Sequence, residues 1–335
     1  MSVAYIILGG IPIAKRRKNT LEPVFVSAIE EKVPEFTDAE KLFYASEKSK
    51  NRLKRTIQWH QENIQAFKRA MFEQGIELNL NNITYRTIRN NLVLYAIEKW
   101  GNQPQTVNMR IRTLKQFFDF LVSEGYLAEN PAARVEKLKT ANTLIVALNK
   151  DQVRRLLAVP DKDTLTGFRD YTIMLLLLDT GLRLSEISGL RISDLHFTEN
   201  FIKVMGKGAK ERTVPLQGKL KKTLREYLQH RGKEPDHDFV FITIDNNPIK
   251  NRTIQDRLDI ISKKAGVTEI RTSPHTWRHT FARMYILNGG DAFSLKTILG
   301  HNSWEMVHRY VKIFGTEVNT QHLKASPLKN LDDNY

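Results

Sequence analysis

The chain has 335 residues, which is long enough for two domains. Of these residues, 41% are hydrophobic and 27% charged, a composition typical of a folded protein that excludes a disordered one. Its 52 Lys and Arg against 37 Asp and Glu leave a net charge of +15, which indicates a polyanionic partner such as nucleic acid, the alternative being a basic surface without one. Cysteine is absent, which excludes disulfides, thiolate catalysis and Cys-ligated metal centres and fits a cytoplasmic location.

Residues 1–35 are punctuated by Pro12, Pro23 and Pro34, and we expect them to form an irregular N-terminal arm. The apolar stretch at 3–14 precedes a group of positive charges instead of following one, so a secretory signal is not expected. Neither this stretch nor the apolar run at 173–178 reaches the roughly 20 residues that a membrane-spanning helix needs. We therefore expect no membrane partner.

Residues 36–140 have a helical pattern throughout and predict a small basic helical bundle. Apolar residues recur at helical spacing in three groups: Leu53, Ile57, Ile64, Phe67 and Met71; Ile88, Leu92, Tyr95 and Ile97; and Val107, Ile111, Leu114, Phe117, Phe118 and Leu121. The polar faces are basic, and we expect DNA contacts from Lys48, Lys50, Arg52, Arg55, Arg110, Arg112 and Lys115. A solvated basic face without DNA contacts is the alternative.

Residues 141–148 are expected to form an extended linker, and residues 149–314 a second domain. Asn149 with Gln152 three residues later is typical of a helix N-terminus, and Gly181 of a helix C-terminus. Two β-like segments at 201–204 and 213–216 predict a hairpin. Helices are expected at 168–180, 184–190, 218–230, 253–265, 276–287, 292–299 and 303–311. The fold class is thus mainly α with a small antiparallel β-sheet.

Five residues far apart in the sequence have side chains suited to act together on a phosphodiester: Arg183, His275, Arg278, His301 and Tyr310. Guanidinium groups match the nonbridging oxygens of a phosphate and stabilise the charge that they gain in the transition state. A tyrosine hydroxyl can attack the phosphorus and keep the bond energy in a covalent link, because the phenol leaves readily when the strand is rejoined. This chemistry requires no Mg²⁺, and we expect neither a metal nor a cofactor.

The hairpin offers two lysines that could protonate the departing 5′ oxygen, Lys207 and Lys210. Lys210 and Arg212 are also expected to bind backbone phosphate.

His275 and His279 are spaced as metal ligands at i and i+4. Arg278 would repel a cation from the same helical turn, so we expect His279 to be a structural hydrogen-bonding residue instead.

Four sequence boxes resemble those of the tyrosine recombinase, or phage integrase, family. They are TGLRLSEI at 180–187, MGKGAKERTVPL at 205–216, PHTWRHTFA at 274–282, and LGH at 299–301 followed by RY at 309–310. All four lie in order within 148–312, so the resemblance covers the whole second domain. Residues 38–139 are similar in general pattern only to the core-binding domain of the same family.

The resemblance implies a role for each matching residue. Tyr310 would be the nucleophile, Arg183 and Arg278 the phosphate clamps, and Lys207 the general acid. His275 and His301 would contact the phosphate or assist proton transfer, and Glu186 would orient the site.

The function expected from this resemblance is site-specific cleavage and rejoining of double-stranded DNA through a 3′-phosphotyrosine, in the integration, excision or transposition of a mobile element. Xer-like resolution of chromosome dimers, a non-catalytic DNA-binding relative and a type IB topoisomerase are the alternatives. Two duplexes require four active sites, so we expect a homotetramer on DNA. Residues 315–335, with Leu323, Leu328 and Leu331, would dock on a neighbouring protomer, and accessory DNA-bending proteins are further candidate partners.

Overall fold

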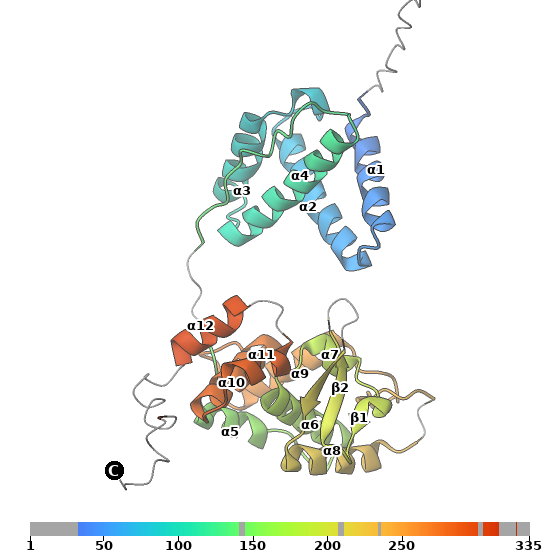
Figure 1. Ribbon diagram of the computed structural model, residues 1–335, viewed down its shortest axis with the longest axis vertical. Coiled ribbons are helices and arrows are strands. Elements are labelled where there is room, and N and C mark those ends of the chain that lie inside the picture. The colour runs from blue at the N-terminus through green and yellow to red at the C-terminus, as the bar shows by residue number, and fades with distance from the viewer. Residues whose placement is uncertain are drawn as a thin grey trace, which may run out of the picture. The chain divides into compact units, whose positions relative to one another are not determined.

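A computed structural model of the protein describes residues 33–140, 145–206, 211–233, 236–300, 304–314 and 326. The chain divides into two compact units, residues 1–142 and 143–335, which are coloured blue to green and green to red in Figure 1. Both are built mainly from helices, and the one sheet of the described residues has three antiparallel strands, which confirms the predicted fold class. Most of the predicted arm and tail lies outside the described residues. Within the described part of the chain, no helix has the length and apolar character needed to cross a membrane.

The first unit is a helical bundle closed around an aromatic core. Its elements are α1 Phe36–Ser49, α2 Lys54–Glu73, the 3-10 turn η1 Leu80–Asn82, the π-helix η2 Thr87–Leu94 that continues into α3 Tyr95–Glu98, and α4 Pro104–Ser123. Phe117 of α4 lies against Phe36 and Phe43 of α1, with ring centroids 5.4 and 5.5 Å apart. The predicted periodicity of α4 is confirmed, because Val107, Ile111 and the other apolar residues named for it are fully buried. Leu53 does not join the core as expected: it is the N-cap of α2 and is 65% exposed.

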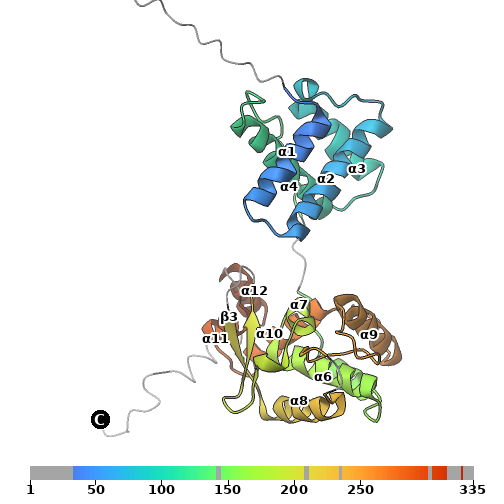
Figure 2. The same ribbon diagram turned by 90° about the vertical axis from the view of Figure 1, so that its right-hand side faces the viewer.

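The second unit packs its helices around a central buried helix, α6 Leu165–Thr180, which contacts α5, α8, α9 and α10. Figure 2 shows α8, α9 and α10 around it. The other elements are α5 Lys150–Ala158, α7 Leu184–Ser188, η3 Ile192–Asp194, β1 Leu195–His196, β2 Phe201–Met205, β3 Glu211–Pro215, α8 Gly218–Arg231, α9 Asn251–Lys264, α10 Pro274–Leu287, α11 Ala292–Leu299 and α12 Trp304–Phe314. The sheet order is β1-β2-β3, and β2 pairs with β3 from Phe201 opposite Pro215 to Met205 opposite Glu211. The predicted hairpin is therefore present, and its turn at 207–210 lies outside the described residues.

Local signals in the sequence explain where helices near the candidate functional residues begin and end. Asn149 and Gln152 form the expected capping box at the start of α5. Gly181 ends α6 in the left-handed conformation with φ 59°, which costs a glycine little. A Cβ at this position would lie 2.5 Å from Cδ1 of Phe281, so the chain turns here in close contact with α10. The turn places Arg183 at the N-cap of α7.

Candidate active site

Arg183 and Glu186 form the base of the site at the first turn of α7. The backbone N–H of Arg183 donates to Oε2 of Glu186 at 2.8 Å, and its Nη1 donates to Oε1 at 2.9 Å. Nη2 of Arg183 reaches across to the carbonyl oxygen of Gly300, 2.9 Å away, at the C-terminus of α11. The arginine is thus fixed at three points, while its side chain keeps 35% of its surface exposed.

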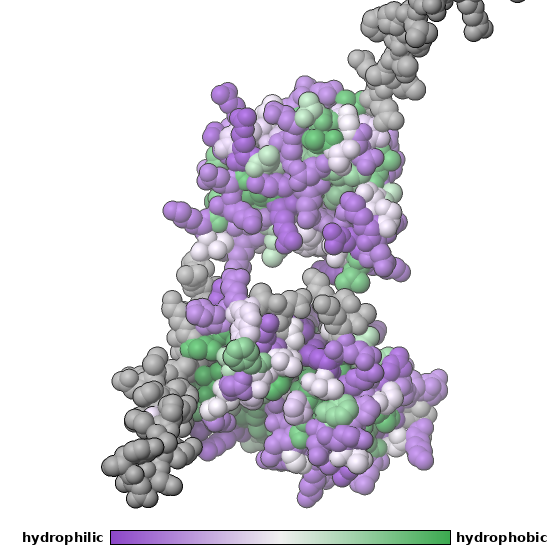
Figure 3. Space-filling view, in the orientation of Figure 1, coloured by the Kyte–Doolittle hydropathy of each residue, from purple (hydrophilic) through white to green (hydrophobic). Residues whose placement is uncertain are grey.

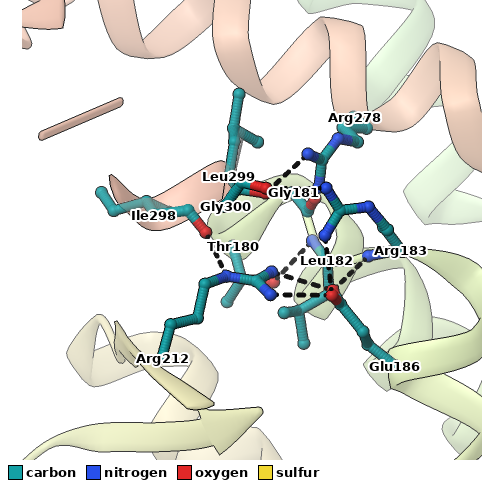
Figure 4. A network of polar contacts seen from close by, with 10 residues as sticks. All are labelled: Thr180, Gly181, Leu182, Arg183, Glu186, Arg212, Arg278, Ile298, Leu299 and Gly300. Carbon is teal, nitrogen blue, oxygen red and sulfur yellow. Dashed lines mark hydrogen bonds and ion pairs between the residues drawn. The ribbon is translucent and has the colours of Figure 1, made fainter. Parts of the chain in front are cut away.

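Arg212 of β3 completes this network from the opposite side of Glu186, as Figure 4 shows. Its Nη1 and Nη2 donate to the two carboxylate oxygens at 2.7 and 2.9 Å, and its Nε donates to the carbonyl oxygen of Ile298 at 2.9 Å. Burial acts to raise the pKa of Glu186, but the hydrogen bonds from Arg212 and Arg183 outweigh it and hold that pKa below its ordinary value. Glu186 is therefore a charged carboxylate at neutral pH, shared by two guanidinium groups.

Arg278 of α10 links the ends of two other helices. Its Nη1 donates to the carbonyl oxygen of Gly181 and its Nη2 to that of Leu299, both at 2.7 Å. Burial, together with the nearby charge of Arg183, lowers the pKa of Arg278 to about 10, which still leaves it protonated at neutral pH. Arg183 and Arg278 are thus two neighbouring cations, held by main-chain oxygens and a single carboxylate. Such a pair is suited to bind an anion.

Tyr310 of α12 is 1% exposed and lies against α10. Its hydroxyl is 2.7 Å from Nδ1 of His279. Burial raises the pKa of the Tyr310 phenol, and the charges of Arg278 and Arg309 act in the opposite direction. The influence of Arg278 on the tyrosine, and of the tyrosine on Arg278, places the two side chains within electrostatic reach of each other.

Of the seven residues predicted to be catalytic, four meet in this part of the fold: Arg183, Glu186, Arg278 and Tyr310. His275 is exposed at the start of α10, with its ring centroid 6.4 Å from that of His279. Lys207 and His301, together with Lys210 of the hairpin, lie outside the described residues. Their roles stay predictions.

Most of the described residues predicted to contact DNA have partners inside the protein. Arg212 directs its guanidinium at Glu186 and Ile298, and its side chain is only 10% exposed. In the bundle, three basic side chains pair with carboxylates: Lys50 and Arg52 with Glu47, and Arg55 with Glu62. Three others have neutral partners: Arg110 donates to Asn102, Arg112 lies over the ring of Trp59, and Lys115 donates to the main chain of Ala133. Lys48 is exposed. Nothing in these contacts tests binding to DNA, which stays a prediction for each of them.

Two residues of the site have contacts that the sequence did not predict, Arg212 with Glu186 and His279 with Tyr310. Arg212 and Glu186 are 26 residues apart in the sequence, and His279 and Tyr310 are 31 residues apart, so no local sequence pattern predicts either contact. The only available signal is that both belong to boxes rich in catalytic candidates.

Comparisons with known proteins match both the sequence and the fold of the chain. The model of the family described as "Phage integrase family" matches residues 147–316. Tyrosine recombinase XerC of Oceanobacillus iheyensis is 29% identical over 287 residues, covering 84% of this chain and 93% of that protein. Tyrosine recombinase XerC of Thermodesulfovibrio yellowstonii is 35% identical over 245 residues, covering 70% and 79%. The crystal structure of a lambda integrase tetramer bound to a Holliday junction shares the fold, with a TM-score of 0.68 at 17% identity over 84% of this chain and 78% of that chain.

Proposed function

Since the chain belongs to the phage integrase family and is a site-specific tyrosine recombinase, we propose that Tyr310 is the nucleophile with which it cleaves and rejoins DNA. The supporting observation is the placement of the phenol by α10. His279 bonds its hydroxyl, and the adjacent Arg278 acts on it electrostatically. Helix α10 thus holds a nucleophile and a phosphate-binding cation together.

The cleavage step transfers the scissile phosphate, still attached to the 3′ end of its strand, from the 5′ oxygen to the tyrosine. The Tyr310 oxygen bonds to the scissile phosphorus, its proton passes to an imidazole of the site, and the bond from phosphorus to the 5′ oxygen breaks. Lys207 supplies the proton that the leaving 5′ oxygen takes up. The resulting 3′-phosphotyrosine keeps the energy of the phosphodiester, so a free 5′ hydroxyl of another strand can reverse the reaction without outside energy.

Arg183 and Arg278 bind the nonbridging oxygens and stabilise the additional negative charge of the transition state. Both already make hydrogen bonds to main-chain oxygens, so their positions are set before DNA binds. Glu186 keeps Arg183 in place through two hydrogen bonds. His275 and His301 contact the phosphate or assist proton transfer, as the family resemblance implies.

The assembly that exchanges strands is a homotetramer on DNA, as in the lambda integrase tetramer bound to a Holliday junction. We assign the contact between protomers to residues 315–335. A mostly apolar groove lined by Ala292, Trp304, Val307 and Val311 lies between α11 and α12, and hydrophobic side chains gather over this part of the second unit (Figure 3). Residues 315–335 follow α12 in the sequence, and their Leu323, Leu328 and Leu331 are apolar side chains suited to such a surface.

The biological role that we favour is integration, excision or transposition of a mobile element in the cytoplasm, with accessory DNA-bending proteins as further partners. Xer-like resolution of chromosome dimers is the second candidate, and the two XerC relatives support it. The chemistry is the same in both.

Trapping the covalent intermediate tests the proposal. The recombination site is first selected from a randomised duplex library, then built into a nicked suicide substrate from which the cleaved fragment diffuses away. Wild-type protein should accumulate as a denaturation-resistant DNA adduct, and Tyr310→Phe should give none. Tyr285→Phe in α10 is the matched control and should trap as the wild type does. Equal trapping by Tyr310→Phe would refute the assignment.

A further inference from the structure

His279 and Tyr310 form a direct contact between α10 and α12. Nδ1 of His279 lies 2.7 Å from the phenolic oxygen, and the two ring centroids are 5.6 Å apart at 57°. The tyrosine is almost fully buried and its histidine partner partly so. A contact this short between a nucleophilic oxygen and a ring nitrogen is a hydrogen bond of good geometry.

The groups around His279 keep its ring neutral, and the direction of its hydrogen bond to Tyr310 then depends on which ring nitrogen carries the proton. His275 and Arg278 approach from the same helix and Tyr310 from α12. Burial first, and then the charges of His275 and Arg278, lower the pKa of His279 to about 4, so the ring is neutral at pH 7. A neutral imidazole that keeps its proton on Nε2 presents a lone pair at Nδ1, and the phenol supplies the proton of the hydrogen bond.

We propose that His279 is the imidazole that accepts the proton of Tyr310 during strand cleavage, a conclusion that rests on the proposed function of Tyr310. As the oxygen bonds to phosphorus, its proton moves along the existing hydrogen bond to Nδ1, and it returns when the strand is rejoined. A weak base suffices, because a phenolic proton becomes strongly acidic once the oxygen bonds to phosphorus. The geometry is already in place, so no rearrangement of the ring is required.

Two non-basic variants test this role. His279→Asn places an amide oxygen near the position of Nδ1 and so keeps a hydrogen-bond acceptor that takes no proton; His279→Gln serves if the Asn variant unfolds. General base catalysis contributes about 100-fold or more, so single-turnover cleavage of the suicide substrate should slow by about that factor while DNA affinity stays unchanged. His230→Asn, an exposed histidine of α8, is the matched control and should cleave at the wild-type rate.

A second substrate distinguishes protonation of the leaving 5′ oxygen from removal of the tyrosine proton. A bridging 5′-phosphorothiolate has a leaving group that needs no proton, so it should restore cleavage to Lys207→Ala but not to His279→Asn. The inference fails if folded His279→Asn cleaves within about threefold of wild type, or if the phosphorothiolate rescues it. Neither result touches the role of Tyr310, which fails only if Tyr310→Phe still forms the adduct.

Discussion

Replacing Glu186 by Gln should destabilise the second unit while leaving its shape almost unchanged. The carboxylate side chain is 4% exposed and accepts four hydrogen bonds, two from Arg183 and two from Arg212. An amide of the same size keeps one accepting oxygen and turns an NH₂ group toward donors that it cannot bind.

The expected loss follows from the burial of each partner. Removing one member of a buried ion pair costs about 3–5 kcal/mol, and exposed pairs contribute about 0–1 kcal/mol. The side chain of Arg212 is 10% exposed, so the loss of its carboxylate partner costs nearly as much as in a fully buried pair. The side chain of Arg183 is 35% exposed, so water partly replaces its lost partner. We therefore expect the free energy of unfolding to fall by about 3 kcal/mol at pH 7.

Urea unfolding of the full chain measures this loss, followed through the transition of the second unit. Glu211→Gln is the matched control on the same strand as Arg212, because Glu211 pairs with Lys203 in the open, and it should change stability by less than about 0.5 kcal/mol. A Glu186→Gln protein as stable as this control would refute the reasoning.

The pH dependence has a definite sign. The folded-state pKa of Glu186 lies below its ordinary value of about 4.3, so its stabilisation is complete above that pH and is lost as the pH falls through the folded pKa. The difference between wild type and Glu186→Gln should stay constant from about pH 8 to about pH 5 and shrink in more acidic solution. A difference that grew on acidification would contradict it.

Three further results are expected. Gly181→Ala should lower the free energy of unfolding by about 2–4 kcal/mol, because it combines a φ of 59° with a Cβ 2.5 Å from Phe281; an unchanged urea midpoint would count against this. Phe117→Ala should cost the bundle about 3–5 kcal/mol by thermal unfolding, since its ring is fully buried; a loss below about 1 kcal/mol would show that the core refills. Deleting residues 315–335 should spare DNA binding in a gel-shift assay and abolish tetramer formation on DNA; normal tetramers would exclude the tail as the contact.

The fold was largely predictable because its signals are local. The apolar spacing of α4 and the Asn149 cap of α5 act within one or two turns, and both are present as expected. Leu53 shows the limit of the method, since a residue at the correct spacing can still fall on the N-cap, outside the helix. The two-residue strand β1 was not predicted, because it exists only through its pairing with β2.

The sequence named candidate residues for the site, but it did not predict the contacts between them. The boxes named Arg183, Arg278 and Tyr310, yet several cations could have paired with Glu186, and only folding brings β3 to α7 and selects Arg212. In the same way, nothing in the sequence distinguishes His275 from His279 as the partner of the tyrosine. That choice depends on which side of α10 the last helix packs against.

Mapping the DNA attachment by mass spectrometry tests the central claim most directly. Wild-type protein trapped on the suicide substrate is digested with nuclease and protease, and the peptide that keeps a nucleotide is sequenced by fragmentation. We predict a single modified residue, Tyr310, joined to a 3′ phosphate. A nucleotide on any other residue, or a 5′ linkage, would contradict the account.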